Sequence, residues 1–286
     1  MRTIGEQAVW SFQEGKQNVQ VRHCTDVRKA PAWPVASYIE LATRVAELQF
    51  RNRDFVLFFR GQTGDFKNAQ SRTTLKPSLF RTVAGRNPSS DVLIRRFEIL
   101  EQAEQMLVER YPGVSSCGSR WVKRHQIVRW SILQHYEVCP TPLLDVTHSL
   151  RIAASFACDR ADNEAFILVL GVPNVSGAIT ASAESGLQIV RLSSVCPPTA
   201  LRPHIQEGYL LGEYPEMTGF KQKRLYEHYE IDFGRRLIAK FQLEPSTFWK
   251  SDAFPRVKRI ALYPSIESDP VRAMAEEIKR TLPRED

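Results

Sequence analysis

The sequence has no run of about 18 apolar residues, so it offers no segment that would form a membrane-spanning helix. Its longest apolar stretch lies around residues 55–59 and has the length of a buried strand. The first residues lack the apolar core of a signal peptide and include an early acid. We therefore expect a cytoplasmic protein with no membrane partner.

Patterns that indicate disulfides or common cofactor sites are also missing. The five cysteines are widely spaced and none form a C-x-x-C pair, which argues against a disulfide framework and against a cysteine zinc site. G-x-S-x-G, Walker A and G-x-G-x-x-G motifs are absent. Kinase, P-loop and Rossmann functions are therefore not expected.

Charge of one sign is not concentrated in any segment. The formal net charge is +7, but the basic residues are dispersed as doublets among acids. A basic surface favours phosphate-bearing partners such as nucleotides or nucleic acid. The charge alone does not establish nucleic-acid binding, because dispersed charges also suit solvated helix faces.

The composition that is present is globular, with 43% hydrophobic and 25% charged residues. Helical spacing of apolar residues prevails early in the chain, and strand-like segments prevail later. This order predicts an α+β fold with a mixed sheet rather than a doubly wound one. Because no Gly/Ser-rich linker appears, we expect an N-terminal arm over residues 1–34 and a single domain over residues 35–286.

Several segments carry the functional argument. Residues 55–59 are predicted to form a buried strand, and residues 120–136 a single helix that ends before two prolines. Residues 202–211 favour a strand more weakly, and residues 221–230 favour a helix.

Arg60 and Gly61 follow the strand over residues 55–59 directly. A guanidinium at the end of a buried strand lies at the rim of the core, where it can bind a carboxylate or a pyrophosphate with two parallel hydrogen bonds. Gly61 permits a turn or the close approach of a ligand to the backbone. An internal partner such as Asp145 explains Arg60 equally well.

The second group of candidates runs from Gln134 to Thr147. His135 lies at the end of the predicted helix, and a proline-bounded turn then leads to a short extended segment. Asp145 and Thr147 are two residues apart in that segment and so point to the same side. Thr147, or alternatively Ser149, also suits capping of the helix that follows, and His135 suits a hydrogen-bonded core position.

Two further possibilities involve acids. Glu207 is positioned to act as a general base or to stabilise a cation, with Gln206 beside it, although an exposed loop glutamate is the alternative. His135, Asp145 and His148 are near enough in sequence to share a metal ion, but no established ligand spacing supports this. We therefore expect no metal cofactor.

Taken in order, these segments resemble the FRG domain. The resemblance is carried by Phe59-Arg60-Gly61, Lys76 to Arg81, Leu133-Gln134-His135-Tyr136, Pro140 to Thr147, Ala153 to Ala157 and Arg202 to Tyr209. It covers roughly residues 36–282. Glu137, Val146 and His204 stand where that family commonly has Gly, Trp and Arg.

The order of segments is also similar to that of ADP-ribosyltransferase-fold enzymes, although Asp145 replaces their first serine. This resemblance implies a split sheet and NAD as substrate. It implies that Arg60 holds the pyrophosphate, that Thr147 seats the nicotinamide ribose, and that Glu207 or Gln206 stabilises the transition state.

We therefore expect an NAD-using transferase or glycohydrolase, of the kind found in conflict effectors. Its catalytic candidates are Glu207, Gln206, Asp145 and His135, and its candidate NAD-binding residues are Arg60, Gly61, Gln134 and Thr147. A non-catalytic nucleotide- or nucleic-acid-binding module and a metal-dependent nuclease are the alternatives.

Overall fold

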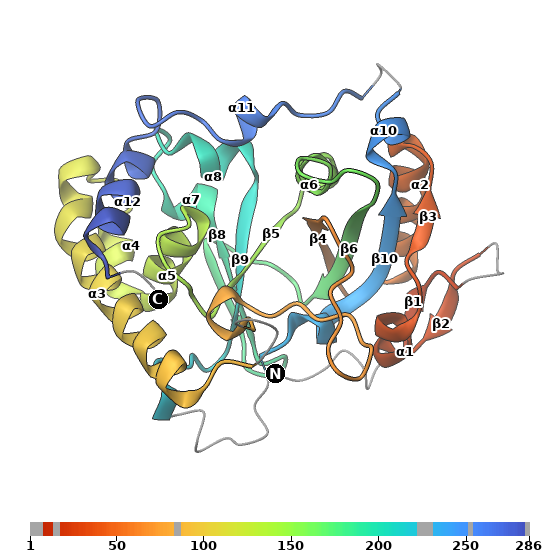
Figure 1. Cartoon of the computed structure of the whole chain (residues 1–286), viewed down its shortest axis with the longest axis horizontal. Helices are drawn as coiled ribbons and strands as arrows, with labels where there is room; N and C mark the ends of the chain where they lie inside the picture. Colours follow the sequence, from red (N-terminus) through yellow and green to blue (C-terminus); the bar gives the residue numbers. More distant parts are fainter. Residues whose placement is uncertain (1–7, 14–17, 83–86, 222–230, 251–253, 284–286) are drawn as a thin grey trace.

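The computed structural model describes the chain apart from residues 1–7, 14–17, 83–86, 222–230, 251–253 and 284–286. The helix expected over residues 221–230 lies almost wholly outside the described residues. In the described residues, helices surround a large mixed sheet, and a small hairpin lies beside it (Figure 1). The α+β prediction is confirmed.

Eight of the strands in the described residues form one sheet, in the order β3-β10-β6-β4-β5-β9-β8-β7. Only the pair of β3 and β10 is parallel. The strands are β3 (Trp33–Val35), β4 (Val56–Gln62), β5 (Leu144–Thr147), β6 (Ala165–Val172), β7 (Ile179–Ser182), β8 (Leu187–Arg191), β9 (Gly208–Glu213) and β10 (Leu237–Leu243). A separate hairpin pairs β1 (Val9–Ser11) with β2 (Gln20–Arg22).

The sheet is nearly divided at its centre. β4 pairs with β6 along seven residues, from Val56 to Gln62, whereas it pairs with β5 at a single position, Phe59 with Thr147. Beyond that position the two strands diverge (Figure 1). The sheet therefore consists of one half with β3, β10, β6 and β4 and another half with β5, β9, β8 and β7.

The helices are divided between the two halves (Figure 1). Beside the first half lie α1 (Cys24–Lys29), α2 (Tyr38–Arg51) and α10 (Pro245–Phe248). Beside the second half lie α3 (Ser90–Val114), α4 (Ser119–Arg124), α5 (Gln126–His135), α7 (Leu192–Val195), α8 (Leu201–Ile205), α11 (Arg259–Leu262) and α12 (Pro270–Thr281). Short 3-10 turns occupy Ser78–Phe80 and Phe233–Arg236.

The remaining helix, α6 (Leu150–Ala157), packs on β4 at the centre of the molecule. Gly61 makes this packing possible: a Cβ atom at that position would lie 2.0 Å from the Ala153 carbonyl oxygen and 2.7 Å from the Ala157 nitrogen. The glycine of the Phe-Arg-Gly motif is therefore required for the contact between helix and strand, independently of any ligand.

Two predicted elements are wrong in detail. The helix expected over residues 120–136 is broken at His125, whose backbone is extended. The break separates α4 from α5, and the buried side chains of Val122 and Ile127 lie on different helices. The strand expected over residues 202–211 begins only at Gly208, because α8 occupies Leu201–Ile205. Pro203 suits that helix start, where its missing N–H leaves no hydrogen bond unmade.

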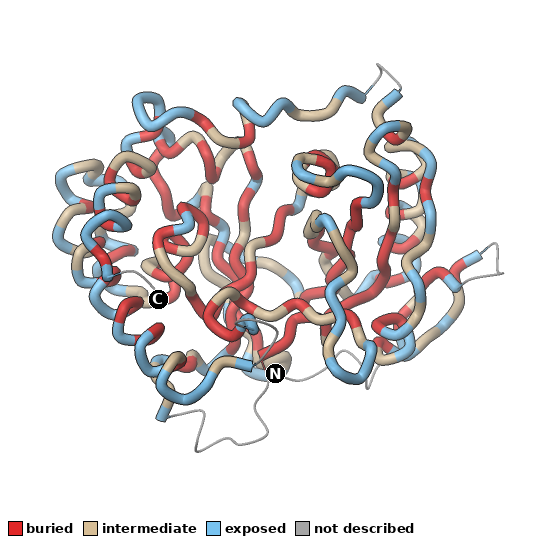
Figure 2. Tube along the Cα trace, viewed as in Figure 1, coloured by how far each residue is buried: buried red, intermediate tan, exposed pale blue. Residues whose placement is uncertain are grey.

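A continuous hydrophobic core joins the buried central strands to their helices (Figure 2). Val9, Val19 and Val27 belong to this same core, so the N-terminal segment packs against residues of the expected single domain. The division at residue 34 stays a prediction. Among the described residues, no helix has the length and apolar character needed to cross a membrane.

Candidate functional site

A cleft of about 370 Å³ opens where β4 and β5 diverge. Its wall includes residues from both halves of the sheet, from the end of α5 and from α6. Seven of the eight predicted site residues line it: Arg60, Gly61, Gln134, His135, Asp145, Thr147 and Gln206. Segments separated by up to about half the chain therefore meet in this cleft.

Glu207 is the predicted residue that does not line the cleft. It is exposed and lies in the turn between α8 and β9, with a φ of 45°. The preceding residue, Gln206, is buried and faces the cleft. Of the two neighbouring candidates, the structure brings only Gln206 to the other site residues.

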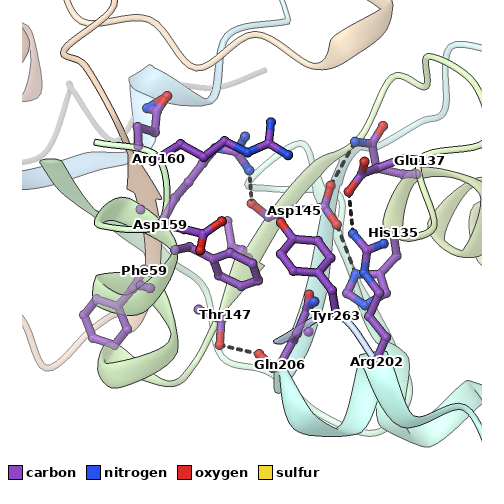
Figure 3. Close-up of a pocket in the computed structure, with 18 of the residues that line it drawn as sticks. Phe59, His135, Glu137, Asp145, Thr147, Asp159, Arg160, Arg202, Gln206 and Tyr263 are labelled. Carbon is purple, nitrogen blue, oxygen red and sulfur yellow. Dashed lines mark hydrogen bonds and ion pairs between the residues drawn. The ribbon is translucent and has the colours of Figure 1, made fainter. Parts of the chain in front are cut away.

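Asp145 is the centre of the polar contacts in the cleft (Figure 3). Its Oδ2 accepts a hydrogen bond from Gln134 Nε2 at 2.9 Å, and its Oδ1 lies 3.2 Å from His135 Nδ1. Its backbone carbonyl accepts a bond of 2.6 Å from Arg60 Nη1. Arg60 therefore does contact Asp145, but through the main chain, so its guanidinium also links the two halves of the sheet.

Gln134 is held in one orientation. Its Oε1 accepts hydrogen bonds from Ser78 Oγ at 2.9 Å and from Thr141 Oγ1 at 2.6 Å. The amide nitrogen must then point away from those hydroxyls, which leaves it to donate to Asp145. Gln134 thus fixes the Asp145 carboxylate rather than facing the cleft with a free amide.

The protonation states follow from burial and from these contacts. Burial lowers the pKa of His135, and its hydrogen bond to Asp145 opposes this only in part. Burial raises the pKa of Asp145, but the His135 hydrogen bond and the Arg60 charge outweigh it and hold the pKa below its ordinary value. The lowered pKa of His135 and the lowered pKa of Asp145 together indicate a neutral His135 that donates from Nδ1 to an ionised Asp145.

Burial also lowers the pKa of Arg60 to about 10, and the nearby charge of Arg81 acts in the same direction. Arg60 therefore keeps its charge at neutral pH. A buried guanidinium near a second arginine is a strong site for an anion, because the low dielectric strengthens the attraction.

Several polar atoms of the lining are buried without a hydrogen-bond partner among the described residues. They are Arg60 Nε, Gln62 Nε2, His135 Nε2 and Arg202 Nε. Buried polar groups of this kind are uncommon in native proteins, and a bound ligand or water is their usual explanation. Since His135 Nδ1 donates to Asp145, its Nε2 carries a lone pair.

Thr147 and Gln206 have mainly structural contacts. Thr147 Oγ1 donates to the Gln206 carbonyl at 2.8 Å and accepts from the Ser149 nitrogen at 3.0 Å, near the start of α6. Gln206 Nε2 donates to the Leu262 carbonyl at 2.6 Å. The N-cap of α6 is Ser149, and no side chain caps the helix, so Thr147 does not have the capping role that one interpretation gave it. It instead fixes the turn before α6, at the position that joins the halves of the sheet.

Sequence reasoning missed part of the rim. Arg202 lies between the rings of Tyr136 and Tyr263, 5.8 and 4.9 Å from their centroids, and forms an ion pair of 2.6 Å with Glu137. Across the cleft, Asp159 and Arg160 lie beyond the end of α6 (Figure 3). The other missed lining residues include Arg81, Glu137 and Tyr263. For Arg81 and Arg202 the family motifs offered a clue, because both fall inside them.

The ligand set considered for a metal nuclease is not assembled. His148 does not line the cleft; its ring packs against Phe58 and Tyr209, 5.6 and 6.4 Å away. In the part of the chain that the structure describes, no group of three His, Cys, Asp or Glu residues is arranged to hold a metal ion.

Residues 56–165 match the family model of the FRG domain. The chain carries an FRG domain. The matched segment runs from β4 to the start of β6 and includes Arg60, His135 and Asp145, whereas Arg202, Gln206 and Tyr263 lie beyond it. Neither the curated proteins nor the solved structures that were searched gave a match. The cleft thus combines residues of the FRG domain with residues contributed by later parts of the chain.

Proposed function

We propose that the cleft binds NAD and that the protein is an ADP-ribosyltransferase-like enzyme that cleaves the bond between nicotinamide and ribose. The observation that carries this proposal is the meeting of Arg60, Thr147 and Gln206 in one cleft at a divided sheet. These residues come from the three segments whose order is similar to that of ADP-ribosyltransferase-fold enzymes. The cleft volume of about 370 Å³ lies within the range of small-ligand sites.

Phosphate binding is assigned to the arginines. Arg60 has a buried Nε without a partner among the described residues, and Arg81 and Arg160 line the same cleft. Guanidinium groups bind phosphate oxygens with two parallel hydrogen bonds, so the pyrophosphate of NAD suits them. Asp145 and Asp159 also line the cleft, so a ligand needs hydrogen-bond donors for these acids as well as phosphates for the arginines. A dinucleotide has both, because its ribose hydroxyls donate.

We assign to Asp145 the transition-state role that the resemblance implied for Glu207 or Gln206. Cleavage leaves positive charge on the ribose carbon as the bonding electrons depart with nicotinamide, and an ionised carboxylate in a partly buried site stabilises that charge. Asp145 is ionised and is held in place by Gln134 and His135. Glu207 is exposed outside the cleft and has no such position.

His135 completes the proposed chemistry. When water or an acceptor hydroxyl attacks the ribose carbon, its proton must go to a base. The lone pair of His135 Nε2 accepts it, and Asp145 stabilises the imidazolium that forms, since it already accepts a hydrogen bond from Nδ1. The transferred group leaves with the water or the acceptor, and the proton is later released to solvent.

The test is NAD turnover by the purified protein, followed as release of nicotinamide. The wild type and Glu207→Gln should be active, whereas Arg60→Lys and Asp145→Asn should be strongly impaired. Arg60→Lys keeps the charge but loses the paired hydrogen bonds. If the wild type neither binds nor consumes NAD with water, protein or nucleic acid as acceptor, the proposal is wrong.

A second candidate is a nucleotide-binding module without catalysis. It is favoured by the internal contacts of the site, because both oxygens of Asp145 and the amide of Gln206 already have protein partners. On this view the cleft network fixes the arrangement of the core segments. Binding of NAD in calorimetry with no release of nicotinamide would favour this candidate over the enzyme.

A further inference from the structure

Residues 254–264, which we term the strap, cross the top of the molecule from the side of α10 to α12 (Figure 1). Over α6 the strap is held by hydrogen bonds from Arg151 Nε to the Pro255 carbonyl at 2.9 Å and from the Val257 nitrogen to Ser155 Oγ at 3.0 Å. At its other end the Leu262 carbonyl accepts from Gln206. The strap therefore connects the two halves of the molecule beside the cleft.

The strap is basic and contains no acid. It contains Arg256, Lys258 and Arg259. Arg151 of α6 binds its Pro255 carbonyl, and Arg160 follows Asp159, which binds its Arg256. One acid, Asp159, is shared as the ion-pair partner of Arg256 and Arg259. We term these five cations the basic ridge. Two of its five cations, Arg256 and Arg259, contact the Asp159 carboxylate, and the net charge of the whole chain is +7.

Next to the basic ridge lies a row of aromatic rings. Tyr38 stacks on Trp249, with centroids 5.5 Å apart and planes at 17°, and Tyr38 also contacts Phe254 at 5.3 Å. Phe254 is 43% exposed, and the other two rings are half-buried. Phe254 is followed directly by Pro255, whose carbonyl accepts a hydrogen bond from Arg151, so the ring row adjoins the ridge.

We propose that the basic ridge and the aromatic row form a binding surface for single-stranded nucleic acid. Cations in a row bind successive phosphates, and exposed aromatic rings stack on unpaired bases, whereas bases inside a duplex are not available for stacking. The ridge ends at the cleft, because Arg160 and Asp159 line it and Tyr263 of the strap forms part of its wall. A bound strand would thus lead into the cleft.

The proposed surface makes single-stranded nucleic acid the acceptor of the ADP-ribose group, and this part of the inference rests on the proposed NAD chemistry. Binding to the ridge needs neither NAD nor an intact Asp145, so it is measured separately. A failure of NAD turnover with intact strand binding would reject only the enzyme. A failure of strand binding with intact turnover would reject only the nucleic-acid surface.

The experiment is fluorescence anisotropy of labelled single-stranded DNA and RNA oligonucleotides with the full-length protein, titrated at several salt concentrations. Lys258→Gln combined with Arg160→Gln should weaken binding at least about tenfold at low salt. The slope of log affinity against log salt should also fall, by roughly 0.7 for each phosphate that the variant no longer neutralises. Phe254→Ala should weaken binding by about fivefold or more because a base can no longer stack on the ring.

The matched control removes two exposed cations elsewhere, Lys123 and Arg124 at the end of α4, by substitution with Gln. It has the same net charge as the double ridge variant and should bind like the wild type. Equal losses in ridge and control variants would overturn the proposal, because they indicate a general response to net charge. Tighter binding of duplex than of single strands, or ridge-dependent binding only to vesicles with anionic lipid, would also overturn it.

Discussion

Two buried polar networks in this protein have opposite characters. The inner network, made of Arg28, Asp65, Thr73, Asp232 and Lys240, lies within the first half of the molecule. In it Arg28 pairs with Asp232, and Lys240 pairs with Asp65 at 2.8 Å while also contacting Thr73 at 2.8 Å. Each charge there has a partner of opposite sign, and the Lys240 and Asp232 side chains are 1% exposed.

The cleft network, made of Arg60, Gln134, His135 and Asp145, is incomplete by comparison. Among the described residues, Arg60 has the main-chain carbonyl of Asp145 as its hydrogen-bond partner, whereas Arg60 Nε and His135 Nε2 are buried without one. The Asp145 side chain is 31% exposed. A network whose charges are all paired stabilises the packing of the chain, whereas one with unpaired polar atoms on residues that line a cleft is suited to a ligand.

Breaking the inner network should produce the largest effect on folding. Asp232→Ala leaves Arg28 buried without its counter-ion and removes the acceptor for the Leu75 and Gly234 nitrogens, so we expect a loss of about 3–5 kcal/mol in the free energy of unfolding. Denaturant titration measures it. The exposed Asp162→Ala should change stability by less than about 0.5 kcal/mol. A similarly small change for Asp232→Ala would show that the pair of Arg28 and Asp232 does not stabilise the fold.

Breaking the cleft network should affect turnover far more than stability. Asp145→Asn retains the size of the side chain, and His135 can accept from the new amide after a change of tautomer. We expect kcat for NAD cleavage to fall by about 10²- to 10³-fold because the negative charge is lost. Steady-state kinetics and denaturant titration on the same sample test this contrast. Equal turnover in wild type and variant would remove Asp145 from the mechanism.

Gly61 tests the packing role of the Phe-Arg-Gly motif. Gly61→Ala places a methyl group 2.0 Å from the Ala153 carbonyl, so α6 must shift, and we expect about 1–3 kcal/mol of destabilisation. Thermal unfolding measures it, and Gly64→Ala, where an added Cβ meets the Phe66 ring at 3.7 Å, is the control. Unchanged stability of Gly61→Ala would mean that the helix has room to adjust.

The position of a site residue could be predicted from the sequence where a short segment of chain determines it. Asp145 and Thr147 alternate along one strand, so their shared side followed from spacing alone. Glu207 was not predictable in this way, because α8 ends at Ile205, two residues before it, and the chain then turns with a positive φ. The rim residues Arg202 and Tyr263 meet only through tertiary packing of distant segments, which no local pattern encodes.

The pH dependence of stability is the smallest of the expected effects and tests His135 alone. Its pKa is lowered in the folded state, so below the ordinary value of 6.5 the unfolded chain binds the proton more readily than the folded one. Stability should therefore fall as pH drops from about 7.5 to about 5, and His135→Gln should show a shallower fall than the wild type. Unfolding free energies at these pH values measure the difference, in which the contributions of the other histidines cancel. A steeper fall in the variant would mean that His135 is charged in the folded protein, and the neutral donor to Asp145 would then be wrong.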